Sequence, residues 1–299
     1  MAEAAREMTR DNPVRTIIIL VVTAGLFERQ AAFVTGAGCG IGFALCRHFA
    51  REGARVAVND SSAERAEGAA RAIAEEISQP RVTAHPADVA DVPALRASIA
   101  AFAESCGRLD VVVANAGITH YGAFLDYDQK TFDRLTSVNL RGTYFTAQAA
   151  ARTMIARRTP GRILLMSSVT GLRAIQNLSA YSMTKAGIRM MARSLALELA
   201  EYGITVNAIS PGAVSTERTR EDDPNFDANW ATVTPTGRTG GVEDVVSAAS
   251  FLTSSQSTHI TGQTLVVDGG WTIRSPLPAD HPDLPARTDK TGGSEARDR

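Results

Sequence analysis

The pattern that most constrains this chain is an alternation of short apolar segments with longer helical ones. Seven apolar segments are predicted strands: 31–34, 53–60, 81–89, 109–117, 162–168, 204–209 and 263–267. Helices are predicted over 43–51, 64–77, 92–105, 128–157, 180–199 and 242–253. Strands that alternate with helices in this way predict a parallel sheet with helices on both faces. Because no linker interrupts the pattern, we expect one α/β domain.

The first predicted strand runs directly into a glycine-rich turn, Thr35-Gly-Ala-Gly-Cys-Gly-Ile-Gly42, and a helix follows. Glycine allows the backbone to approach a ligand closely, and the free N–H groups at a helix start attract a pyrophosphate. A glycine-rich turn can also be simply a flexible loop. Its position between a strand and a helix favours a dinucleotide-binding turn.

The second predicted strand ends in an acid, Asp60, 18 residues after Gly42. In dinucleotide-binding units such an acid hydrogen-bonds the ribose hydroxyls of the adenosine, and it repels an added 2′-phosphate. Ser61 and Ser62 follow it, and Cys39 in the glycine loop is also uncharged. Asp60 therefore favours NAD over NADP, and it can cap the next helix at the same time.

Polar or small residues stand where several predicted strands end: the glycine turn, Asp60, Asp88, Asn115 and Ser168. Ligands of parallel α/β sheets bind beyond the carboxyl ends of the strands. The sequence therefore predicts one binding crevice that these positions share.

Tyr181 and Lys185 are four residues apart in a predicted helix, so they lie on one face of it. An ammonium close to a phenol favours the phenolate, which makes the tyrosine a usable proton donor and acceptor. The same spacing also occurs in ordinary surface helix pairs, so the pair alone does not establish catalysis.

Composition excludes several classes of function. The formal net charge is −1, and no basic run is interleaved with aromatic residues, so we expect no nucleic-acid partner. Three cysteines without Cys-x-x-Cys spacing argue against a disulfide framework and a zinc site. The five histidines are scattered, and no metal site is expected.

Three regions fall outside the regular pattern. Residues 1–27 form an N-terminal extension whose apolar run at 17–27 is shorter than the roughly 20 residues of a membrane span. Mixed charges precede this run, which disfavours a signal peptide. We expect an element packed on the body and a cytoplasmic protein, with a targeting or membrane-tethering role as the alternative. The polar segment 215–236 is expected to be an irregular substrate lid or a mobile surface loop, and the Pro-rich tail, 275–299, to be disordered.

Taken together, these motifs resemble the short-chain dehydrogenase/reductase superfamily. The resemblance rests on Thr35–Gly42, Asn115-Ala-Gly117, Ser168 thirteen residues before Tyr181, Lys185, and Pro211-Gly212. It implies a Rossmann-type, doubly wound sheet of seven strands ordered 3-2-1-4-5-6-7, in a single domain over 28–274. It also implies a homotetramer or dimer. Ala114 replaces a common asparagine, and the N-terminal extension has no counterpart in members of ordinary length.

The resemblance also implies roles for individual residues. Tyr181 would be the general acid/base, Lys185 would bind the nicotinamide ribose and stabilise the phenolate, Ser168 would hold the substrate oxygen, and Asn139 would anchor a water in the proton relay. The cofactor would contact Gly36, Cys39, Gly40, Ile41, Gly42, Asp60, Asp88, Val89, Asn115, Ala116, Gly117, Tyr181, Lys185, Pro211, Gly212, Val214 and Thr216.

The expected activity is hydride transfer between NAD(H) and a secondary alcohol or ketone. The polar residues Gln176 and Asn177, together with the acidic lid, favour a sugar or polyol. His120, Tyr121 and Thr170 are further pocket candidates. One alternative is a 3-oxoacyl-thioester reductase that uses NADPH. A second is a non-catalytic regulator that binds a dinucleotide.

Overall fold

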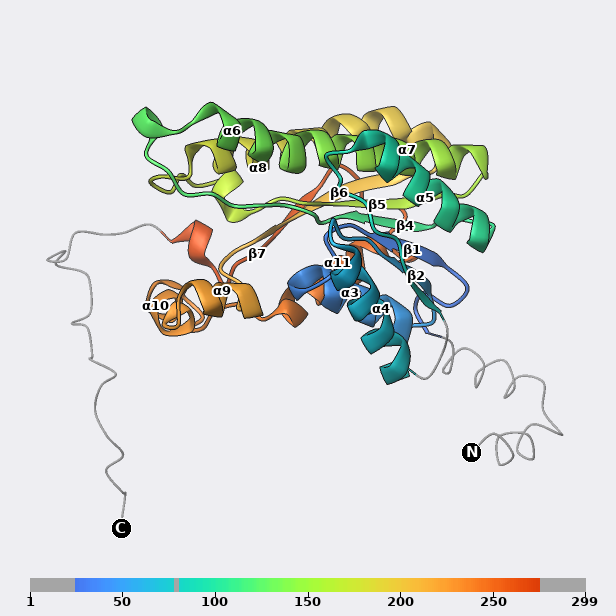
Figure 1. Ribbon diagram of the computed structural model, residues 1–299, viewed down its shortest axis with the longest axis horizontal. Helices are drawn as coiled ribbons and strands as arrows, with labels where there is room; N and C mark the ends of the chain where they lie inside the picture. Colours follow the sequence, from blue (N-terminus) through green and yellow to red (C-terminus); the bar gives the residue numbers. More distant parts are fainter. Residues whose placement is uncertain (1–24, 78–80, 275–299) are drawn as a thin grey trace, which may run out of the picture.

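The computed structural model describes residues 25–77 and 81–274, and its centre is a single sheet (Figure 1). Its seven strands are all parallel and follow the order β3-β2-β1-β4-β5-β6-β7. The strands are β1 Ala31–Val34, β2 Arg55–Val58, β3 Val82–Ala84, β4 Val111–Ala114, β5 Arg162–Met166, β6 Thr205–Pro211 and β7 Thr264–Val267. The expected Rossmann-type fold and strand order are therefore confirmed.

Helices cover both faces of the sheet, as Figure 1 shows. One layer contains α3 Gly40–Arg51, α4 Ala63–Ile77 and α11 Val242–Thr253. The other contains α5 Val92–Cys106, α6 Gln129–Thr136, a π-helical turn Ser137–Gly142, α7 Thr143–Ala156 and α8 Ser179–Leu199. Each layer seals a separate apolar core against the sheet, so the central strands are buried on both sides.

Several strands end earlier than the sequence predicts. β2 ends at Val58 rather than at Asp60, β3 ends at Ala84 rather than at residue 89, and β4 ends at Ala114. In β1 and β4 every residue is buried, and the polar residues Thr35 and Asn115 follow directly. The strands end where these polar residues begin. The polar residues therefore stand together along the carboxyl edge of the sheet.

The segment 215–236 is not irregular, contrary to the sequence-based expectation. It contains two short helices, α9 Glu217–Asp222 and α10 Phe226–Val233 (Figure 1). Thr216 starts α9 through a reciprocal capping box, because its hydroxyl accepts the Thr219 N–H and its own N–H donates to the Thr219 hydroxyl. The Trp230 ring packs edge-on against the Trp271 ring, with centroids 6.1 Å apart. We call residues 215–236 the lid.

Leu26 and Phe27, at the end of the expected N-terminal extension, pack against the body. Phe27 is fully buried and stacks edge-on against Phe49 at 4.8 Å. The N–H groups of Leu26 and Phe27 both donate to Glu52. Residues 17–24 of the apolar run and the expected disordered tail lie outside the described residues. In the described part of the chain, no helix is long and apolar enough to cross a membrane.

Candidate active site

The crevice lies at the carboxyl edge of the sheet, between β1 and β4. From β1 the strand order runs outward through β2 and β3 on one side, and from β4 through β5 to β7 on the other. The loops that leave β1 and β4 therefore diverge onto opposite faces, which is the position where α/β sheets bind ligands. The glycine turn follows β1 and Asn115-Ala-Gly117 follows β4, so two of the segments expected to bind a dinucleotide leave the sheet at this point.

Thr35 and Asn115 join the two strands across this crevice. The Thr35 hydroxyl accepts the N–H groups of Asn115 and Ala116, each at 3.0 Å. The Asn115 amide nitrogen donates to the carbonyl oxygens of Thr35 and Gly36, each at 2.9 Å. Asn115 therefore ties the glycine loop to β4.

The glycine loop has no space for side chains at most of its glycines. Gly36 has a φ of +60°, and an added Cβ would lie 2.7 Å from the Ala116 Cα. A Cβ at Gly42 would clash with the carbonyl oxygen of Gly36. Gly40 differs, because its φ is +57° but the nearest atom to an added Cβ is a Thr216 methyl at 3.6 Å. The loop is thus folded by packing against the protein itself, and only the Gly40 side has room for a ligand.

The start of α3 is prepared for an anion. Cys39 is the N-cap residue of α3, and its side chain makes no capping hydrogen bond within the described structure. The first turn of α3 contains no acidic residue. Its N–H groups are therefore free to bind a pyrophosphate, and Ile41 and Gly42 lie in this turn. This geometry fits a dinucleotide.

Asp60 carries an ion pair that sequence reasoning missed. The Arg65 guanidinium, one turn into α4, donates to Asp60 Oδ1 from Nη2 at 2.7 Å and from Nε at 3.1 Å. The Ser62 N–H also donates to Oδ1, at 3.0 Å, and the Gly38 N–H donates to Oδ2, at 3.2 Å. The residues directly after Asp60 carry no positive charge, but Arg65, five residues later in α4, does. The uncharged neighbours of Asp60 therefore gave a misleading picture of the charge around its carboxylate.

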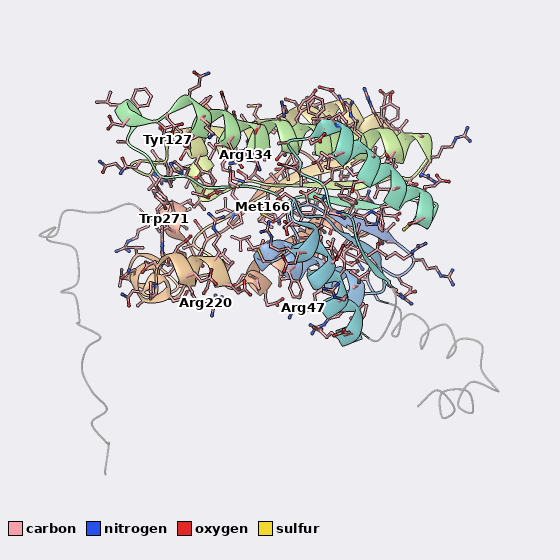
Figure 2. All side chains as sticks on the ribbon, in the orientation of Figure 1. Arg47, Tyr127, Arg134, Met166, Arg220 and Trp271 are labelled. Carbon is pink, nitrogen blue, oxygen red and sulfur yellow. The ribbon has the colours of Figure 1, made fainter. Side chains whose placement is uncertain are left out.

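Asp88 and Val89 lie next along the edge, after β3. Asp88 accepts hydrogen bonds from the Ala90 N–H and from Arg134 on α6, each at 2.9 Å. Figure 2 labels Arg134 in the upper helical layer. Val89 is buried beneath Gly142, where an added Cβ would lie 2.7 Å from a Val89 methyl. Both residues therefore follow β3 at the carboxyl edge of the sheet, and their contact with the cofactor stays a prediction.

Tyr181 and Lys185 do share one face of α8, as the spacing predicts. The Lys185 side chain is buried, and its Nζ donates to the carbonyl oxygen of Met166 at 2.9 Å. Met166 lies in the central sheet between the two helical layers (Figure 2). Lys185 Nζ is 5.5 Å from the centroid of the Tyr181 ring, and Tyr181 itself is only partly buried. A buried cation thus lies beside a phenol that a substrate can reach.

Asn139 holds the opposite wall of the site and is completely buried in the π-helical turn. Its Oδ1 accepts the Ile118 N–H at 2.9 Å, and its Nδ2 donates to the Ile118 carbonyl at 2.9 Å and to Thr184 Oγ1 at 3.2 Å. The Thr184 hydroxyl donates in turn to the Tyr181 carbonyl at 2.7 Å. An added Cβ on Gly117 would lie 3.3 Å from Lys185 Nζ and 3.5 Å from Asn139 Oδ1. Asn139 therefore connects the loop after β4 to α8.

Ser168 follows β5 and caps the short 3₁₀ helix Val169–Gly171, with its hydroxyl accepting the Thr170 N–H at 3.2 Å. This turn packs tightly on α8, since an added Cβ on Gly171 would lie 2.7 Å from the Lys185 carbonyl carbon. The Thr170 hydroxyl is buried and has no hydrogen-bond partner among the described residues. Ser168 and Thr170 thus bring hydroxyls to the side of the sheet edge that carries α8.

The segment after β6 leads into the lid. Gly212 packs against Asp268, where an added Cβ would lie 2.8 Å from the Asp268 Cβ, and Pro211 ends β6. Val214 is buried and pairs with Gly240 in an isolated bridge. The Thr216 hydroxyl accepts the Thr219 N–H in its cap, and the expected contact of Thr216 with the cofactor stays a prediction. Asp227 of α10 accepts the Ser215 hydroxyl at 3.0 Å and the Thr239 hydroxyl at 2.7 Å, which fastens the lid to the body.

The remaining pocket candidates lie at the mouth of the site. Tyr121 is 61% exposed, and the partial desolvation of its phenol raises the pKa, with a further increase from the neighbouring Tyr181. His120 stacks edge-on against Tyr127 at 5.7 Å. Asn177 has a φ of +65°, and its carbonyl accepts the Gly122 N–H at 2.9 Å, which joins the loops after β4 and β5. Gln176 and Asn177 are exposed.

This combination of fold and site defines a dinucleotide-dependent oxidoreductase that acts on secondary alcohols and ketones. Residues 36–272 match the family model described as enoyl-(acyl carrier protein) reductase. The chain belongs to the short-chain dehydrogenase/reductase superfamily, as the sequence motifs indicate.

Similar proteins include several that act on sugars and polyols. L-rhamnose 1-dehydrogenase (NAD(P)(+)) of Azotobacter vinelandii is 37% identical over 245 residues, which cover 81% of this chain and 96% of that protein. Galactitol 2-dehydrogenase (L-tagatose-forming) of Cereibacter sphaeroides is 36% identical over 250 residues, which cover 82% of this chain and 96% of that protein. A crystal structure of a gluconate 5-dehydrogenase from Burkholderia cenocepacia J2315 in complex with NADP and tartrate superposes with a TM-score of 0.78. It is 36% identical and covers 84% of this chain and 99% of that one.

The Asn139 contacts generate a stability prediction. In Asn139→Ala, the partly buried N–H and carbonyl of Ile118 both lose their side-chain partner, so we expect the free energy of unfolding to fall by about 2 kcal/mol. The measurement is urea unfolding followed by circular dichroism. The control is Gln129→Ala on the preceding helix, because Gln129 is exposed and should change stability by less than about 0.5 kcal/mol. Equal effects of the two substitutions would contradict the structural role of Asn139.

Proposed function

We propose that the protein is a sugar or polyol dehydrogenase that transfers a hydride between NAD(H) and a secondary hydroxyl or its ketone. The observation that carries this proposal is the buried Lys185 cation beside the accessible ring of Tyr181. Lys185 is held by the Met166 carbonyl, and no acidic side chain among residues 25–77 and 81–274 forms an ion pair with it, so its positive charge remains beside the phenol. Such a charge favours the phenolate and prepares Tyr181 for proton transfer.

Each residue of the site has a defined task in this proposal. When bound, the nicotinamide dinucleotide supplies the hydride acceptor or donor. Tyr181 takes the proton from the substrate hydroxyl in oxidation and returns it in reduction. The Ser168 hydroxyl donates a hydrogen bond to the substrate oxygen. Asn139 acts as a positioning residue, because its amide holds Ile118 and Thr184 and so fixes the loop after β4 against α8.

The glycine loop, Asp60 and the edge at Asp88 and Val89 would hold the cofactor. We propose NAD as the preferred cofactor, since the buried Asp60 carboxylate lies beside the glycine loop, where it can accept hydrogen bonds from ribose hydroxyls. The names of two relatives include NADP or NAD(P), so NADP is the second candidate.

The mouth of the site supports a hydroxyl-rich substrate. Tyr121, Gln176 and Asn177 present exposed polar groups there. Polar groups of this kind select substrates that carry several hydroxyls. The sugar and polyol names of the similar proteins point to the same class.

A 3-oxoacyl-thioester reductase is the second candidate, because a 3-oxoacyl-[acyl-carrier-protein] reductase of Chlamydia trachomatis is 34% identical to this chain over 247 residues. A screen distinguishes the two. The protein is assayed with NAD and NADP against L-rhamnose, galactitol and gluconate, and with NADPH against acetoacetyl-CoA. We expect turnover with a sugar or polyol. Dinucleotide binding with no turnover on any substrate would instead favour a non-catalytic regulator.

The decisive variant is Tyr181→Phe, which keeps the ring but removes the proton carrier. We expect kcat to fall by about a thousandfold or more, with NAD binding within a few-fold of wild type. Tyr202→Phe is the control, because Tyr202 lies in a 3₁₀ turn after α8 and is 45% exposed. Turnover close to wild type in Tyr181→Phe would refute the proposed mechanism.

We further propose a homotetramer or dimer, assembled in part through α8. Met183, Met190 and Leu197 are 47%, 57% and 84% exposed and recur every seven residues, so they form one apolar stripe along α8. On α7, Tyr144 and Ile155 are also exposed. A stripe of this kind is typical of a helix that packs against a copy of itself.

Sedimentation velocity tests this assembly. We expect Leu197→Arg to shift the protein towards a smaller species, because the charge would be buried without a partner. Leu125→Arg is the matched control, since Leu125 is 91% exposed but lies outside the stripe. If Leu197→Arg and wild type sediment identically, the α8 interface is wrong.

A further inference from the structure

A buried arginine at the amino edge of the sheet has no part in the proposed reaction. Arg162 is the first residue of β5 and is only 8% exposed. Its Nη1 donates to the carbonyl oxygen of the preceding Gly161 at 2.8 Å. Within residues 25–77 and 81–274, Nε and Nη2 donate to no acceptor, and no acidic side chain forms an ion pair with Arg162.

The unpaired side of this guanidinium is the side that binds carboxylates elsewhere in the protein. Arg108 uses Nε and Nη2 to hold the two oxygens of Asp110, at 2.7 and 2.6 Å. Arg65 uses the same two nitrogens to hold Asp60 Oδ1. These N–H groups form a planar fork that suits a small anion. In Arg162 the fork has no partner among the described residues.

A second buried polar group lies beside the fork. Thr205 of β6 is the register partner of Arg162, so the two side chains project from the same face of the sheet. Thr205 is 5% exposed, and its hydroxyl has no hydrogen-bond partner in the described part of the chain. Asn207, the next β6 residue on this face, differs, because its amide donates to the Ile260 carbonyl and accepts the Gln263 N–H. The unpartnered groups are therefore local to Arg162 and Thr205.

The acid whose charge acts on Arg162 is Asp110, and that acid is already engaged. Arg108 holds both of its oxygens, and the Ala31 N–H donates to Oδ2 at 2.8 Å. Burial lowers the pKa of the Arg162 guanidinium, and Asp110 only partly opposes this lowering. Arginine stays charged at neutral pH, and a buried charge without a partner destabilises a fold. An anion bound at the fork would remove this destabilisation.

We propose that Arg162 and Thr205 form a binding site for a small monovalent anion such as chloride. The Nε and Nη2 groups of Arg162 donate two hydrogen bonds to the anion, and the Thr205 hydroxyl donates a third. The ligand is small because both side chains are almost completely buried. The site lies at the amino ends of β5 and β6, away from the carboxyl edge, so it does not depend on the proposed activity.

Thermal unfolding of the full-length protein tests the site without an assay of turnover. Chloride is varied from about 2 mM to about 200 mM at constant ionic strength, with sodium glutamate as the balancing salt, and unfolding is followed by circular dichroism. We expect the Tm of wild type to rise by about 4 °C, because a ligand that binds only the folded state stabilises it. In Arg162→Met the rise should disappear. In Thr205→Val it should require roughly tenfold more chloride, because one hydrogen bond is lost.

Arg55→Met is the matched control. Arg55 begins β2 as Arg162 begins β5, and its Nη1 also donates to a carbonyl oxygen, that of Ser105, at 2.9 Å. Its side chain is exposed, so the dependence of Tm on chloride should persist in this variant. A rise of equal size in Arg162→Met overturns the inference, since it would be a general effect of salt. Loss of the rise in Arg55→Met overturns it as well.

Crystals soaked in sodium bromide locate the anion directly, because bromide scatters anomalously. We expect an anomalous peak within about 3.5 Å of Nε and Nη2 of Arg162 in wild type, and none at that position in Arg162→Met. A water molecule there, or bromide at other positions only, overturns the inference. So does a peak without the chloride-dependent rise in Tm, which would mean binding at crystal concentration only. Failure of the proposed sugar or polyol activity leaves all of these results unchanged.

Discussion

The seam between β1 and β4 is the constraint on which the site depends. The strands wind away from it in both directions, so the loops after β1 and β4 open a crevice there. The Thr35 hydroxyl and the Asn115 amide close the seam with four hydrogen bonds. Gly36 fits beneath Ala116 only because it has no side chain, so this packing shapes the loop before any ligand arrives.

The other half of the site is built around α8. The Lys185 ammonium donates to the Met166 carbonyl of β5. Gly171 lets the turn that follows Ser168 pack closely against α8. Asn139 connects the loop after β4 to Thr184 of α8. Each contact joins a different segment of the chain to α8. Proton-transfer groups need this rigidity, because small displacements of a reacting atom reduce the rate strongly. The dinucleotide side and the α8 side meet at Gly117, which lies close to Lys185 and Asn139.

Much of this arrangement could be predicted, because it follows from local patterns. Buried strands, the glycine turn and the spacing of Tyr181 and Lys185 depend on a few neighbouring residues. The ion pair between Asp60 and Arg65 could not be predicted. Arg65 is one of several charged residues in α4, and only the folded structure shows that it is the one that contacts Asp60. The lid helices were missed because their support is long-range, as in the packing of Trp230 on Trp271. Phe27 was assigned to the extension for the same reason, since Phe49 holds it.

Isotope transfer tests the central claim, that this site moves a hydride from a carbinol carbon. The protein is incubated with NAD and with L-rhamnose, galactitol or gluconate deuterated at its carbinol carbons, and the nucleotide is recovered and analysed by mass spectrometry and NMR. We expect deuterium at C4 of the reduced nicotinamide with at least one substrate, and none when Tyr181→Phe replaces the wild type. Reduced nucleotide without deuterium, or equal labelling by the variant, would contradict the account.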